Sequence, residues 1–166
     1  QMVRQDWMNL NGLWNYAITD ASTPAAPDAQ GQILVPFAIE SSLSGVGKRV
    51  SKGEALWYER EFTVPKQWKG KNVLLHFGAV DWHAEVFVND VFLGEHKGGY
   101  DPFSFDVTPA LKKSGRQVIR VKVQDATDNS FQPRGKQCII NTGIWYTPVT
   151  GIWQTVWLEP VTPAHI

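Results

Sequence analysis

The residues best equipped for chemistry lie in a short stretch near the end of the chain, residues 133–137 (PRGKQ). Arg134 offers a planar fork of N–H donors and Lys136 a mobile point charge, so together they suit a carboxylate, a phosphate or a partner's acidic side chain. The neighbouring proline and glycine give this turn more shape than an ordinary solvated run. The alternative is an exposed basic turn without a ligand, and the residue types alone do not separate the two.

Aromatic and amide side chains follow within ten residues. Trp145 and Tyr146, bordered by glycine, threonine and proline, can form a platform on which a sugar ring stacks. They can equally fix this loop onto the body of the domain. Asn141 adds hydrogen-bonding capacity between the basic turn and the aromatic pair.

Two other segments carry candidate binding residues, at 81–83 (DWH) and 98–103 (GGYDPF). Asp81 and Trp82 suit a sugar, because an indole stacks on its CH-rich face while a carboxyl binds its hydroxyls. We favour the structural alternative, in which Trp82 closes one end of the domain and Asp81 caps a turn. Tyr100 follows two glycines that permit a close backbone approach, and it can face a ligand or pack inward.

The signatures of other catalytic classes are missing from the sequence. There is no Gly-x-Ser-x-Gly turn, and Cys138 has no histidine near it in the sequence. No calcium loop occurs, and no metal-ligand spacing links the four histidines, which are His76, His83, His96 and His165. We therefore expect neither a metal nor a cofactor. Acidic residues on apparent strand faces and in turns are interpreted as solvated surface: Glu59, Glu61, Glu85 and Asp90.

Length and charge narrow the class of partner. A chain of 166 residues fits one domain with a real hydrophobic core. Its 16 basic and 16 acidic residues cancel, so no global field favours nucleic acid or an anionic membrane. The single cysteine excludes an internal disulfide but leaves the compartment open, with export from a bacterial cell favoured over the cytoplasm. No apolar run is long enough to span a bilayer, and a leader before Gln1 can have been removed.

Period-two alternation predicts an all-β fold of about eight or nine short strands, as in a sandwich or jelly roll. The dipeptide Asn89-Asp90 predicts a tight hairpin turn, and Thr108 is expected to cap the one helical turn. Surface loops are expected at 21–30 and 41–53. The expected strands cover residues 13–18, 33–35, 57–64, 73–77, 84–89, 91–93, 103–107, 119–123 and 152–158.

The last of these strands poses a problem of exposure. Ile152, Val156 and Leu158 fall on one face, whereas Trp153 and Trp157 fall on the other. Two tryptophans facing water on one strand would be costly, so we expect a neighbouring strand layer or another domain to cover them.

Six motifs follow one another along the chain. They are residues 10–14 (LNGLW), 35–37 (VPF), 57–62 (WYEREF), 86–89 (VFVN), 105–108 (FDVT) and 151–159 (GIWQTVWLE). This ordered series resembles the N-terminal sugar-binding domain of family 2 glycoside hydrolases, the group of β-galactosidases, β-glucuronidases and β-mannosidases. The resemblance covers residues 10 to 160, and the whole chain, residues 1–166, is expected to be this single domain. It implies a galactose-binding-domain-like jelly-roll β-sandwich.

The resemblance also implies a division of labour. In that family an immunoglobulin-like domain and a TIM barrel follow, and both catalytic glutamates belong to the barrel, so no catalytic residue is expected in this chain. The first domain contributes a loop to the rim of the barrel's pocket, and Asn141, Trp145 and Tyr146 map onto that loop. Some family members place an aspartate there, but residues 137–157 contain no acidic residue. Specificity for galactose or glucuronate is therefore not carried over.

Three functions remain open at this point. The first is an accessory domain that contacts carbohydrate and the downstream domains of a glycoside hydrolase. The second is a freestanding carbohydrate-binding module with a sugar site around Trp82, Tyr100 and Trp145. The third is a protein-interaction sandwich that uses the face of Trp153 and Trp157.

Overall fold

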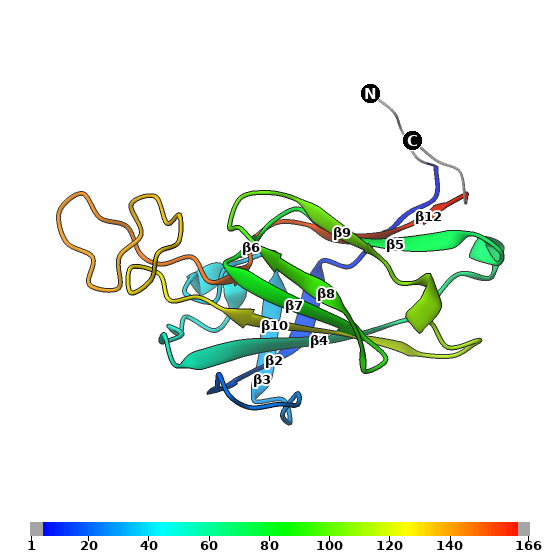
Figure 1. Cartoon of the computed structure of the whole chain (residues 1–166), viewed down its shortest axis with the longest axis horizontal. Coiled ribbons are helices and arrows are strands. Elements are labelled where there is room, and N and C mark those ends of the chain that lie inside the picture. The colour runs from blue at the N-terminus through cyan, green and yellow to red at the C-terminus, as the bar shows by residue number, and fades with distance from the viewer. Residues whose placement is uncertain (1–4, 163–166) are drawn as a thin grey trace.

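Alternating strands assemble into two antiparallel sheets in the computed structural model, which describes residues 5–162. The four-stranded sheet lies over the six-stranded sheet (Figure 1). The larger sheet has the order β3-β2-β4-β10-β7-β8, with bounds Gly31–Val35, Gly12–Asp20, Glu54–Phe62, Gln117–Gln124, His83–Val88 and Val91–Lys97. The smaller has the order β1-β12-β5-β9, with bounds Met8–Asn9, Val156–Val161, Asn72–Phe77 and Phe103–Asp106.

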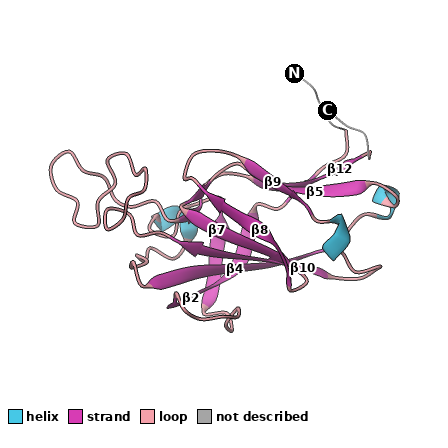
Figure 2. Cartoon of the chain, viewed as in Figure 1, coloured by secondary structure: helices cyan, strands magenta, loops and turns pink. Residues whose placement is uncertain are grey.

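Short elements complete the architecture, and Figure 2 shows how little helix they contain. A two-stranded ribbon joins β6 (Val80–Asp81) to β11 (Gly151–Ile152) at one end of the sandwich. Three 3-10 turns are present in the described residues: η1 (Ser42–Ser44), η2 (Lys66–Trp68) and η3 (Thr108–Ala110).

The core lies between the two sheets. Inward positions alternate along each strand, so that in β10 Ile119, Val121 and Val123 are fully buried. Trp14 packs edge-on against Tyr58 with ring centroids 6.3 Å apart, and its Nε1 donates to the carbonyl of Leu10 at 2.8 Å. This hydrogen bond satisfies the indole N–H, which is the only polar group of the buried Trp14 side chain.

The prediction of an all-β sandwich is confirmed. Nine strands of four residues or more lie close to the predicted ones, and the three further strands have only two residues each. Asn89 and Asp90 both adopt positive φ, at 50° and 67°, and form the predicted turn between β7 and β8.

The expectation of one continuous strand over residues 152–158 is wrong. The segment divides into β11 and β12, because its partner bends at Gly78. Val156 pairs with Phe77 on β5, whereas Ile152 pairs with Val80 on β6. At the bend, a Cβ on Gly78 would lie 2.8 Å from that of Gln154, so the two chains approach too closely for a larger residue.

The two outward tryptophans are each half-covered by the chain itself. Trp157 stacks on His76 of the adjacent strand, with ring centroids 4.8 Å apart. Trp153 donates from Nε1 to the carbonyl of Gly99 at 2.8 Å and meets the Tyr100 ring edge-on. Within the described chain this partial covering comes from a same-sheet neighbour and a loop, not from a strand layer, and covering by another domain stays a prediction.

The helical prediction needs two corrections. Three helical turns occur in the described part of the chain instead of one. Thr108 does not cap η3, because its Oγ1 accepts from the backbone N–H of Val73 at 2.8 Å. Val107 occupies the cap position without a side-chain hydrogen bond. No helix among residues 5–162 is long and apolar enough to cross a membrane.

Candidate functional site

The long segment between β10 and β11, residues 125–150, projects from the end of the sandwich beside the β6–β11 ribbon (Figure 1). Buried carboxyl groups hold its base. Asp125 accepts from Thr150 Oγ1 at 2.8 Å and from Thr127 N at 2.7 Å. Glu40, from the segment before η1, accepts from Thr150 N at 2.9 Å. Thr150 therefore ties two acidic side chains to the point where the loop rejoins the sheet.

Gln137 fixes the middle of the loop to the sandwich. Its Nε2 donates to Asp81 Oδ2 at 3.0 Å, and its Oε1 accepts from Val149 N at 2.6 Å. The loop also folds back on itself, because Tyr146 N donates to the carbonyl of Lys136 at 2.8 Å. These bonds bring the basic turn next to the aromatic pair, with Arg134 near Trp145 and Lys136 near Tyr146.

A cleft of about 370 Å³, here called the end cleft, lies between this loop and the ribbon. It unites five of the eight residues predicted from the sequence. The lining residues are Asp81, Tyr100, Arg134, Lys136, Gln137, Tyr146, Thr147, Val149 and Trp153. Pockets that bind small ligands have volumes of roughly 300–1,000 Å³, so the end cleft has room for a sugar unit.

The walls of the end cleft are aromatic. Tyr100 and Tyr146 are 52% and 63% exposed, and Trp153 is half-buried with its indole N–H already bonded. Tyr100 therefore faces the cleft instead of packing inward. Lys136 Nζ lies 5.8 Å from the centroid of the Tyr146 ring. The cleft thus joins apolar ring faces to a mobile ammonium group, which can donate to ligand oxygens.

Arg134 has mainly structural contacts. Its Nη1 donates to the carbonyl of Gln137 at 2.8 Å, and its guanidinium lies 5.5 Å from the centroid of the Trp145 ring. The carboxylate of Asp128 lies 3.7 Å away. Of the two predicted cations, Lys136 is therefore the one with freedom to reach a ligand.

Asp81 forms the floor of the cleft and is 2% exposed. Burial raises the pKa of this carboxyl from 3.8 to about 7; the Gln137 hydrogen bond opposes the rise, and the charges of Asp125 and Glu40 add to it. Burial likewise raises the pKa of Glu40. The expectation that Asp81 caps a turn is wrong, because its carboxyl bonds across the fold to Gln137. Near pH 7 the group can be either a hydrogen-bond donor or an acceptor.

Three predicted residues do not line the end cleft. Trp82 is half-buried and joined to Asp81 by a cis peptide bond. Asn141 accepts from Arg49 Nη2 at 3.1 Å. Trp145, 40% exposed, carries the Arg134 guanidinium on its ring. Sequence reasoning missed Trp153 as a cleft residue, because its place in a strand motif indicated scaffold or a protein-interaction face rather than a sugar site.

The described residues contain no cluster of side chains suited to binding a metal ion. Within 5–162, no group of three or more His, Cys, Asp or Glu side chains could hold a metal ion. His83 bonds to Glu95 at 2.7 Å and His76 stacks on Trp157, so each has a contact other than a metal. His165 lies outside the described residues.

Comparisons with known proteins identify the family of the chain. The family described as glycosyl hydrolases family 2, sugar binding domain, matches residues 46–160. A β-galactosidase of Bacteroides ovatus is 33% identical over 169 aligned residues, covering 95% of this chain and 18% of that protein. A β-glucuronidase of Formosa agariphila is 36% identical over 111 residues, covering 67% of this chain and 11% of that protein. The chain thus spans less than a fifth of the length of these relatives.

Solved structures give the same result. The β-glucuronidase of Lactobacillus rhamnosus superposes with a TM-score of 0.74 at 25% identity, over 96% of this chain and 30% of that one. The β-glucuronidase of Ruminococcus gnavus in complex with D-glucuronic acid gives a TM-score of 0.73 at 22% identity, which shows a shared fold. The family match covers most of the chain. The chain therefore belongs to glycosyl hydrolase family 2 and corresponds to its sugar-binding N-terminal domain.

Proposed function

We propose that residues 1–166 serve a larger family 2 glycoside hydrolase as its non-catalytic, carbohydrate-contacting domain. In this proposal the end cleft faces the sugar. The loop of residues 126–149 packs against the TIM barrel that the family resemblance places downstream, beyond an immunoglobulin-like domain. Hydrolysis of the O-glycosidic bond takes place on that barrel, and this domain helps to shape its pocket.

The composition of the end cleft is the observation that carries the proposal. Tyr100, Tyr146 and Trp153 supply ring faces and edges at its walls, and Lys136 and Asp81 supply polar groups. A pyranose presents the complementary pattern, because its CH groups pack on aromatic rings while its hydroxyls need donors and acceptors.

The acidic residues of the end cleft favour binding over catalysis. Glycoside hydrolases use two carboxyl groups that lie roughly 5–10 Å apart across the scissile bond. Asp81 is the one carboxyl that lines the end cleft among the described residues. A single buried acid can orient a sugar, but it does not provide both an acid and a second carboxylate.

Apolar side chains on the projecting loop support contact with another protein surface. Phe131, Ile140 and Ile144 are 110%, 79% and 67% exposed, so the loop leaves several large apolar groups in water. Such a concentration of exposed apolar groups is typical of a surface that a partner covers. Because the loop also borders the end cleft, a catalytic domain docked on it would lie next to any sugar held there.

The two alternatives have less support. A freestanding carbohydrate-binding module was expected to bind sugar around Trp82, Tyr100 and Trp145, but of these three only Tyr100 lines the end cleft. Such a module also leaves the exposed apolar side chains of the loop without a role. A protein-interaction sandwich was suggested by the exposure of Trp153 and Trp157, and both now have contacts within the chain.

Calorimetric titration with methyl β-D-galactoside and methyl β-D-glucuronide tests sugar binding. We expect a millimolar Kd for at least one sugar, weakened about tenfold by Tyr146→Ala, which removes a stacking surface worth about 1.4 kcal/mol. Lys136→Met should weaken it as well, whereas Lys112→Met, at an exposed lysine outside the cleft, should not. A titration curve that both cleft substitutions leave unchanged would refute the assignment of the cleft. An open reading frame without a catalytic barrel after Ile166 would refute the accessory role.

A further inference from the structure

A second cavity lies on the outer face of the six-stranded sheet, away from the end cleft. This cavity, here called the sheet groove, has a volume of about 280 Å³. It is lined by residues 24–26 of the β2–β3 loop and by Trp57, Phe87, Asp90 and Arg120. None of these residues lines the end cleft. Strand β7 runs from Asp81–Trp82 toward the Asn89-Asp90 turn, so its six residues separate the two cavities by roughly 20 Å.

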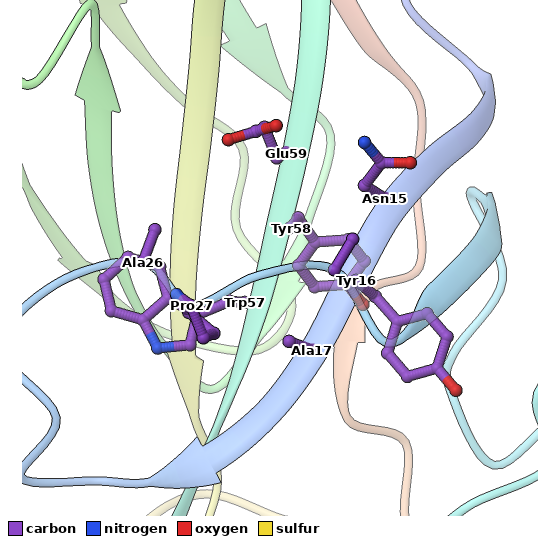
Figure 3. A pocket seen from close by; sticks show the side chains of 9 residues that line it. Asn15, Tyr16, Ala17, Ala26, Pro27, Trp57, Tyr58 and Glu59 are labelled. Atoms are coloured by element: carbon purple, nitrogen blue, oxygen red, sulfur yellow. The ribbon is translucent and has the colours of Figure 1, made fainter.

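The loop that roofs the sheet groove is held in place. Gln30 Oε1 accepts from Ile18 N at 3.1 Å, and Gln30 Nε2 donates to Ile18 O at 2.9 Å. Ala21 N donates to the carbonyl of Gly53 at 2.9 Å. Figure 3 shows Ala26 and Pro27 of this loop beside the Trp57 indole of β4. The groove therefore lies between the β2–β3 loop, which these hydrogen bonds hold in place, and the outer face of the sheet.

Aromatic rings form the floor of the groove. Trp57 stacks on Phe87, with centroids 6.2 Å apart and an interplanar angle of 30°. Phe92, 54% exposed, lies 5.3 Å from Phe87 and extends the aromatic surface toward the hairpin. These residues come from β4, β7 and β8, so the surface crosses much of the sheet.

One polar group on this floor has no protein partner. Trp57 is 95% buried, and its Nε1–H has no hydrogen-bond acceptor. An unpaired buried donor costs roughly 1–3 kcal/mol, and this N–H has almost no exposed surface, so its acceptor must be a small molecule enclosed beside it rather than a ligand in the open groove. Trp57 also lines a small cavity of about 20 Å³, shown in Figure 3, which has room for one water molecule.

Charged groups form the rim of the groove. Arg120 Nε donates to Glu59 at 2.7 Å, and its Nη1 donates to Asp90. These bonds fix the guanidinium and leave other N–H groups for a ligand, since Arg has five. Two carboxylates flank the guanidinium, and Lys122 Nζ lies 5.6 Å from the centroid of the Trp57 ring, so positive and negative charges around the groove balance and no net field attracts an anionic ligand. Hydroxyl groups, by contrast, can donate to Asp90 and accept from Arg120.

We propose that the sheet groove is a second carbohydrate site, for a neutral pyranose unit. The sugar's CH face packs on Phe87 and Phe92, and two adjacent hydroxyls bond to Arg120 and Asp90. The site is independent of the proposed function, because it uses a different face and different residues. It gives the chain a means of holding a saccharide at a distance from the end cleft.

The indole N–H signals of a ¹⁵N-labelled chain test this proposal. The chain has eight tryptophans, and Trp57→Phe identifies the signal of Trp57. We expect methyl β-D-galactoside to shift that signal saturably at roughly 10 mM, well above a millimolar Kd, and methyl β-D-glucuronide to shift it less. Arg120→Met should weaken the response at least about tenfold, whereas Tyr146→Ala in the end cleft should leave it unchanged.

Two outcomes would overturn the proposal. The Trp57 signal can remain still at this sugar concentration, which would mean that no sugar binds against the stacked Trp57–Phe87 pair. It can also shift equally in the Arg120→Met and wild-type chains, which would place the sugar elsewhere. Asp90→Asn provides a second variant, because Asn tolerates the positive φ at this position. The signal of Trp153 reports the end cleft separately, so the two sites can fail independently.

Discussion

Replacing Asp81 by Asn should stabilise the chain at pH 8 and leave its stability nearly unchanged at pH 4. Burial raises the pKa of Asp81 in the folded state from 3.8 to about 7. Between these values the unfolded chain has lost the proton and the folded chain retains it. Stability therefore falls by about 1.4 kcal/mol per pH unit as the pH rises through this window, up to a total of roughly 4 kcal/mol.

The geometry makes Asn a close mimic of the neutral acid. Gln137 Oε1 accepts from Val149 N, so Gln137 must present its NH₂ group to Asp81 Oδ2. The proton of neutral Asp81 then lies on Oδ1, the oxygen that has no hydrogen-bond partner. In the variant the side-chain carbonyl replaces Oδ2 and the NH₂ group replaces Oδ1. The Gln137 bond is kept while ionisation is removed.

Urea unfolding followed by tryptophan fluorescence from pH 4 to pH 8 measures the effect. The difference in unfolding free energy between Asp81→Asn and wild type should grow from near zero to as much as roughly 4 kcal/mol. Asp28→Asn, at an exposed position of the β2–β3 loop, controls for the loss of one surface charge. A difference for Asp81→Asn that stays constant across this pH range would show that the carboxyl ionises as readily in the folded chain as in the unfolded one.

Three further predictions concern the same end of the fold. Gly99→Ala should lower the free energy of unfolding by about 1–3 kcal/mol, measured by thermal unfolding, because its Cβ would lie 2.7 Å from the carboxyl carbon of Asp81. Gly53→Ala, whose Cβ would have no atom within 4 Å, should change stability little. Equal losses in the two variants would contradict the packing argument. Gln137→Leu leaves Val149 N unpaired and should lower stability by about 1–3 kcal/mol and speed limited proteolysis within residues 126–148, so cleavage at the wild-type rate would count against the anchor. The 166-residue chain should release no nitrophenol from p-nitrophenyl β-D-galactoside or β-D-glucuronide, since its cleft has one carboxyl; turnover lost on changing a carboxylate of this chain would refute that.

The long strands could be predicted because their signal is local. Alternation along residues 119–123 and the Asn89-Asp90 dipeptide each determine structure through neighbours in sequence, and β10 and the β7–β8 turn follow from them. The break between β11 and β12 could not be predicted in this way, since it lies opposite a bend at Gly78, between the partner strands β5 and β6. Two-residue strands such as β6 are too short to show any period.

The end cleft was predictable as a set of residue types but not as a contact map. Lys136 and Tyr146 lie in one segment, and their chemistry is visible there. Asp81 and Gln137, however, are 56 positions apart, and Glu40 and Thr150 are 110 apart. No sequence pattern predicts such pairs, because the two residues of each pair meet only when the folded sheets bring distant loops together at one end of the sandwich. The raised pKa of Asp81 is a product of the same packing, since burial is its main cause.

The way this loop is held explains how it can keep large apolar side chains in water. A loop that contained Phe131, Ile140 and Ile144 would ordinarily gain by folding them onto the sandwich. Here hydrogen bonds to Asp81 and Asp125 fix the loop instead, and they do so at its base and middle. Buried carboxyl groups are costly anchors, as the pKa of Asp81 shows, whereas an apolar anchor would use the very side chains that the loop exposes. Polar anchoring therefore orders the loop without using its apolar side chains, which stay exposed and, under the proposed function, are the ones that a catalytic domain covers.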